Sequence, residues 1–219
     1  MLAVCAQTAW AQRSDPGTVT LQATVSGYVD IAAGGAAALS GGSGGTITGN
    51  PNKGNPLSGL TISFGDVSPL NTNAFVKATV PLRLRSNIGY VLTVTTSSSS
   101  STDPLALQLS DVGFGIVPPS RADNGVYAAG VDSPAAASLG DPSLDPDQDP
   151  ATPRWDFKPE KSLGNYLSSN TVLTGERIMT VVPGSFIGGL MLNTFFVIKP
   201  QFFSPGSFTT TVTYTISTP

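Results

Sequence analysis

The sequence contains no histidine, and its only cysteine is Cys5. These two absences exclude imidazole-based acid/base catalysis, zinc sites of the Cys/His kind and a disulfide framework. Charge is also scarce, since only 11% of positions are charged and the net charge is −3. Lysine and arginine occur singly, which disfavours a nucleic-acid interface. We therefore expect a protein that is not an enzyme, has no catalytic residues and does not bind nucleic acid.

The first eleven residues resemble the end of a secretory signal peptide. They are uncharged, small or apolar, and Ala9 and Ala11 lie where signal peptidase requires small side chains. Cleavage after Ala11 would also remove Cys5. No later apolar run approaches the roughly 20 residues of a transmembrane helix. We expect a protein without a transmembrane segment that is secreted to the cell surface, the extracellular space or the periplasm.

Long helices are disfavoured by the 24 glycines and 18 prolines. Apolar and polar residues alternate instead over short stretches, the pattern of half-buried strands. We predict an all-β fold, an antiparallel sandwich or barrel, in a single domain over 12–219. The clearest strand signals are Thr18–Val25, Leu60–Phe64, Ala74–Arg85, Tyr90–Thr95 and Phe208–Ile216.

Turns and loops between these strands give more specific expectations. Pro81 has no N–H to donate, so it predicts a sheet edge or a bulge. The turn residues 86–89 favour a hairpin between the strands on either side. Residues 32–59 are rich in glycine, alanine and serine, and we expect a mobile loop there. Residues 118–161 are rich in proline and aspartate and predict an exposed excursion from the domain.

Four aspartates in this excursion have the spacing of an oxygen-donor calcium loop. Asp145, Asp147, Asp149 and Asp156 occupy offsets 1, 3, 5 and 12. Offset 6 lacks the usual glycine, and prolines stiffen the segment. The pattern thus admits two interpretations, a calcium site or a solvated acidic loop held extended by proline. No other cofactor is indicated.

Trp155 and Phe157 form the only aromatic pair within the excursion. An exposed aromatic face can stack on a sugar ring, so the pair could form a carbohydrate-binding platform. Equally, a pair of this kind can anchor a long loop to the core. The first interpretation predicts a secreted carbohydrate-binding module, with or without calcium.

Threonine-rich alternating strands also give the chain a family resemblance. The segments TVTLQATVSGYVDI, LRLRSNIGYVLTVT and SPGSFTTTVTYTIS resemble exported bacterial pilin-like β-sandwiches, such as spore-coat-U-type and related fimbrial subunit domains. The closing segment matches the family's terminal strand at Gly206, Phe208, Thr209, Thr211, Val212 and Thr213.

The resemblance implies an immunoglobulin-like sandwich and a structural role in a surface or fimbria-like assembly. Its partners would be other copies of itself or other surface subunits, joined by strand addition. The natural donor is Thr18–Val25, whose apolar face carries Val19, Leu21, Ala23 and Val25. The same strand could instead complete its own domain.

Overall fold

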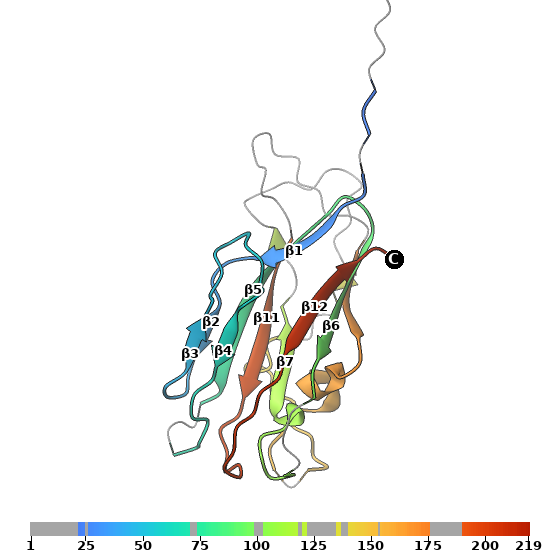
Figure 1. Cartoon of the computed structure of the whole chain (residues 1–219). Coiled ribbons are helices and arrows are strands. Elements are labelled where there is room, and N and C mark those ends of the chain that lie inside the picture. The colour runs from blue at the N-terminus through green and yellow to red at the C-terminus, as the bar shows by residue number, and fades with distance from the viewer. Residues whose placement is uncertain are drawn as a thin grey trace, which may run out of the picture.

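The computed structural model consists of antiparallel β-sheets, shown in Figure 1. It describes residues 22–24, 26–70, 74–98, 103–117, 120–121, 135–136, 140–152, 154–175 and 190–219. Within these ranges the helices are short 3-10 turns and none is α-helical. The all-β prediction is confirmed, as is the antiparallel pairing.

The larger sheet has six strands, built around β5 (Val76–Ser86) and β11 (Leu190–Ile198). Its main order is β1-β5-β11-β7, while β2 also pairs with β5 and β8 with β11. The other members are β1 (Val29–Ala33), β2 (Ala38–Ser40), β7 (Val112–Ile116) and β8 (Ser120–Arg121). Strand β11 lies in the interior of this sheet, and most of its side chains are buried.

The second sheet has four strands in the order β12-β6-β10-β9. They are β6 (Tyr90–Thr96), β9 (Ala135–Ala136), β10 (Asn170–Gly175) and β12 (Val212–Ser217). A separate two-stranded sheet pairs β3 (Thr46–Thr48) with β4 (Thr61–Ser63). The 3-10 turns are η1 (Leu109–Asp111), η2 (Pro159–Lys161) and η3 (Leu163–Tyr166).

One hydrophobic cluster joins the two larger sheets. Alternation in β5 and β6 turns every second side chain inward, so that Leu82, Leu84 and Leu92 are fully buried. The same cluster takes in β7, β10, β11 and η3. A hydrogen bond of 2.8 Å between Thr194 Oγ1 and the Tyr214 hydroxyl also links β11 to β12. The sheets therefore share a single core.

The predicted hairpin between β5 and β6 is wrong. The two strands belong to different sheets, so the turn at 87–89 carries the chain from one sheet to the other. A short turn specifies where the chain reverses but not which strand it pairs with.

Pro81 lies in the interior of the larger sheet and not at its edge. Strand β5 has β11 on one side and both β1 and β2 on the other. The Pro81 carbonyl accepts the Gly34 N–H at 2.8 Å, between the residues that pair with β1 and those that pair with β2. In an antiparallel strand the N–H and C=O of one residue point to the same side. The N–H that Pro81 lacks would therefore point to the gap between β1 and β2, where the sheet does not need it.

The glycine-rich segment 32–59 is not a structureless loop. It contains β2 and β3, and the Asn50 amide bridges the two backbone groups of Ala37, at 2.7 and 3.0 Å. Gly49 has a φ of 63°, and a Cβ there would lie 2.1 Å from the Gly59 carbonyl oxygen. Here glycine permits close backbone packing.

Candidate functional site

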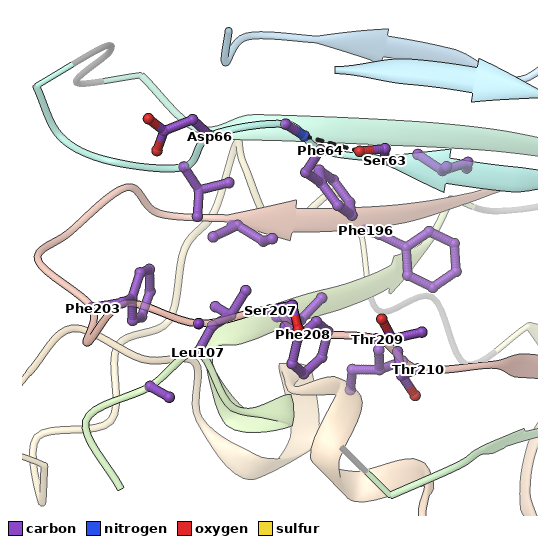
Figure 2. Close-up of a pocket in the computed structure, with 18 of the residues that line it drawn as sticks. Ser63, Phe64, Asp66, Leu107, Phe196, Phe203, Ser207, Phe208, Thr209 and Thr210 are labelled. Carbon is purple, nitrogen blue, oxygen red and sulfur yellow. Dashed lines mark hydrogen bonds between the residues drawn. The ribbon is translucent and has the colours of Figure 1, made fainter. Parts of the chain in front are cut away.

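A groove of about 1010 Å³ opens into the core beside β4 and the segment that leads into β12. Its apolar lining includes Val80 of β5, Val112 of β7 and both Phe196 and Ile198 of β11. In Figure 2, Ser63, Phe64 and Asp66 follow one side, while Phe203 and residues 207–210 follow the other. The four core side chains from β5, β7 and β11 are at most 8% exposed, whereas Ile62, Phe64 and Phe208, which also line the groove, are only half-buried.

Both sides of the groove carry strand edges without a neighbour in the described part of the chain. Strand β4 pairs only with β3, and β12 only with β6. Ahead of β12, the backbone of residues 206–209 forms no hydrogen bond with another described residue. Unpaired N–H and C=O groups at a sheet edge are a template for an added strand. The groove therefore combines an apolar lining with backbone donors and acceptors that no other described residue satisfies.

The C-terminal strand follows the alternation seen in its sequence. Val212, Tyr214 and Ile216 pack against the core, and the threonines between them are exposed. Burial raises the pKa of the Tyr214 phenol, and its hydrogen bond with Thr194 opposes that rise only in part. Tyr214 lines the groove, so its hydrogen bond with Thr194 holds one residue of the groove wall in place.

The excursion braces one wall of the groove from outside. The side-chain amide of Gln201 accepts the Trp155 N–H at 3.2 Å and donates to the Trp155 carbonyl. Next to it, the Arg154 guanidinium lies 5.7 Å from the centre of the Phe203 ring and donates to the Ala106 carbonyl at 3.1 Å. Two consecutive residues of the excursion thus hold both Gln201 and Phe203 in place.

A buried ion pair holds Arg154 in this position. We call the contacts of Arg154 and Trp155 with Gln201 and Phe203 the brace. Arg154 donates to Asp111 Oδ2 at 2.7 Å, and the Gln108 N–H donates to the same oxygen at 2.6 Å. Asp111 Oδ1 is buried without a hydrogen-bond partner in the described part of the structure. Burial raises the pKa of Asp111 to about 6; Gln108 and Arg154 lower it, and the nearby Asp156 raises it. The ionised carboxylate is therefore costly in this setting.

The four aspartates of the predicted calcium loop lie with different partners. Asp145 pairs with Lys161 at 3.0 Å and Asp147 with Lys158 at 2.6 Å. Asp149 accepts the Ala151 N–H at 2.8 Å, whereas Asp156 is buried and accepts from the Thr152 hydroxyl. Among the described residues, no three Asp, Glu, His or Cys side chains gather where they could hold a metal ion. The four carboxylates therefore have separate partners, and one of them, Asp156, is buried.

Trp155 and Phe157 anchor the excursion to the larger sheet. Their rings meet edge to face at 4.8 Å, and the Trp155 ring contacts Phe75 in the same way at 5.4 Å. Phe157 is buried beside Phe195 and Val197, and a Cβ at Gly113 would lie 2.6 Å from its ring. These contacts match the anchoring interpretation. The excursion is therefore packed against the sheet along this part.

The predicted donor strand lies mostly outside the described residues. Val19, Leu21 and Val25 are not described, whereas Ala23 is exposed and its immediate neighbours form no strand. The groove was not foreseen, although the alternation in 208–216 marks the strand beside it. Within the described ranges no helix has the length and apolar character needed to cross a membrane.

The sequence matches no protein-family model and no curated protein.

Proposed function

We propose that this protein is a secreted, non-enzymatic structural subunit of a bacterial surface or fimbria-like assembly, in which copies associate by strand addition. On this proposal the two larger sheets form an immunoglobulin-like, pilin-like sandwich that lacks one strand. The groove accepts residues 18–25 of another copy. The observation that carries the proposal is the groove itself, apolar inside and flanked by strand edges that have no partner among the described residues.

The chemistry of the donor strand supports this pairing. Alternate side chains of an extended segment point to one side, so Val19, Leu21, Ala23 and Val25 would enter the groove together. The intervening threonines and Gln22 would face solvent, as the threonines of β12 do. Main-chain hydrogen bonds to the free edges would supply affinity, and the apolar pockets would supply register.

The resemblance to pilin-like subunits supports the same proposal. The residues that carry it in the closing segment, from Gly206 to Thr213, are those that form one side of the groove and begin β12. The signal-like residues 1–11 support export.

Light scattering of the whole chain across a wide concentration range tests the proposal. The wild-type chain is expected to associate, and a donor-blocked variant, Val19→Asp/Leu21→Asp, is expected to be monomeric because two charges would enter an apolar groove. The matched control is Thr20→Asp/Gln22→Asp, which adds the same charge on the opposite face and should associate like the wild type.

Two results would contradict strand exchange between copies. A wild-type chain that is monomeric at every concentration, with a donor-blocked variant that unfolds more readily, would show that the strand completes its own domain. Equal association of both variants would show that the alternating face plays no part.

A further inference from the structure

Large apolar side chains are exposed mainly at one end of the molecule. Of the six that are exposed in the described part of the chain, four belong to loops at this end: Leu70, Leu105, Leu144 and Phe202. Three of them are more than 80% exposed. Such a concentration of exposed apolar side chains favours an interaction surface. We call these four residues the apolar end.

The pairing of the strands and two further contacts place the loops of all four residues at the same end of the larger sheet. Val76 begins β5 and pairs with Ile198, the last residue of β11, so the loop before β5 and the segment after β11 meet at one end of the sheet. Leu70 lies in the first and Phe202 in the second. The Ser204 N–H donates to the Leu105 carbonyl at 2.9 Å. Lys77 pairs with Asp141 at 2.8 Å, which holds the loop of Leu144 near the start of β5.

The chain enters the domain from the opposite end. Val29 begins β1 and pairs with Ser86, the last residue of β5. Asn87 fixes the preceding residues, since its side chain accepts the Tyr28 N–H at 2.6 Å and donates to the Ser26 carbonyl at 2.8 Å. In Figure 1 the blue segment leaves the body at this end, and the red loop after β11 lies at the other.

We propose that the apolar end is the surface on which the body of the donor copy rests, in contact with the region of its Tyr28 and Ile88. This inference rests on the proposed function. Only Ser26 to Tyr28 separate the donor strand from β1, and these span about 10 Å when extended. The donor body must therefore lie directly against the end of the groove where its strand emerges.

The groove reaches the apolar end, because Phe202 belongs to both, and the donor strand would leave the groove there. Leu107, Phe202 and Phe203 line it there. The donor brings apolar groups of its own, because Tyr28 is 48% exposed and Ile88, which lies beside Gly27, is half-buried. Opposite ends in contact form a heterologous interface, which repeats without closing and produces a filament. The partner is thus a second copy of this chain, placed end to end.

The test uses a variant that alters the apolar end and leaves the groove intact. Leu70→Ser/Leu105→Ser/Leu144→Ser changes three exposed side chains, none of which lines the groove. The matched control is Leu167→Ser, an exposed leucine outside the set. Two quantities are measured: the concentration at which the whole chain associates, and the affinity of a synthetic peptide of residues 18–25 for the donor-blocked chain carrying the same changes.

The triple variant is expected to need about tenfold more protein to associate, while its peptide affinity stays within about twofold of the parent. The control should change neither quantity. If the triple variant associates like the wild type although the peptide binds, the apolar end is not an interface. If the peptide fails to bind any chain but the triple variant still loses association, strand addition is wrong and the end-to-end interface stands.

Discussion

The core of this protein is closed on one side and open on the other. Leu82, Leu84 and Leu92 are fully buried where β5 faces β6. Beside β4 and the segment before β12, the same core is reached by a groove of about 1010 Å³. Both regions come from alternating strands, so alternation alone does not decide whether a face is covered. The neighbour of each strand decides it, and on the open side the described chain supplies none.

The largest expected difference between the two sides is in the cost of a truncated side chain. Leu92→Ala on the closed side should lower the free energy of unfolding by about 2–5 kcal/mol, because it leaves a cavity among fully packed neighbours. Ile62→Ala beside the groove should cost less than about 1 kcal/mol, since Ile62 is only half-buried and lines the open space. Urea denaturation of the donor-blocked chain measures both, and equal losses would mean that the groove is filled.

The brace behind the open side predicts a pH-dependent effect. Arg154→Met removes the cation that faces the buried Asp111, so the free energy of unfolding should fall by about 2–4 kcal/mol at pH 7.5. The pKa of Asp111 is raised to about 6 by burial, so the folded protein binds its proton more tightly than the unfolded chain. The carboxyl therefore stabilises the fold fully below about pH 4, and this contribution is lost as the pH rises through 6.

The loss caused by Arg154→Met should accordingly be smaller at pH 5, where Asp111 is mostly protonated. Chemical denaturation at the two pH values measures this difference. Adding Asp111→Asn to Arg154→Met should restore part of the stability at pH 7.5, because no unpaired charge stays buried. Equal losses at both pH values would mean that Arg154 acts through its packing on Phe203 alone.

Where the closed and open sides meet, Tyr214→Phe is expected to have a moderate effect. It removes the 2.8 Å hydrogen bond between the Tyr214 hydroxyl and Thr194 but keeps the ring. Thr194 can still donate to the Val80 carbonyl at 3.2 Å, so the expected loss is about 1 kcal/mol. Thermal and urea unfolding measure it. A loss as large as that of Leu92→Ala would place Tyr214 within the closed side.

The smallest expected effect is at the exposed rim of the excursion. Asp147→Asn breaks the ion pair between Asp147 and Lys158, in which each side chain is about one third exposed. Solvent and salt weaken such a pair, so no measurable change in stability is expected. An effect comparable to that of Arg154→Met would show that the brace depends on the whole acidic loop and not on the buried pair.

Alternation in the sequence predicted much of the fold, because it reports which side chains face the core. It located β4, β5, β6 and β12 within a few residues. It could not predict that β5 and β6 belong to different sheets, since pairing depends on contacts between distant residues. For the same reason the groove, formed between 57–68 and 201–212, has no local signature.

Composition was misleading where the local packing is specific. The glycine-rich segment 32–59 was expected to be a loop, but it contains β2 and β3. The aspartate spacing at 145–156 matched a calcium loop, although each carboxylate has its own partner in the described structure. Trp155 and Phe157 could be assigned to anchoring only once their contacts with Phe75 and Gly113 were known.

Amide hydrogen exchange on the donor-blocked chain, with and without a synthetic peptide of residues 18–25, tests the central claim most directly. Strand addition predicts that the peptide slows exchange at the groove edges, in residues 61–64 and 206–212, and leaves the central amides of β5 and β11 unchanged. A peptide of the same composition in scrambled order is the control. If the native peptide slows exchange at neither edge, or no more than the scrambled one does, the groove is not a strand acceptor.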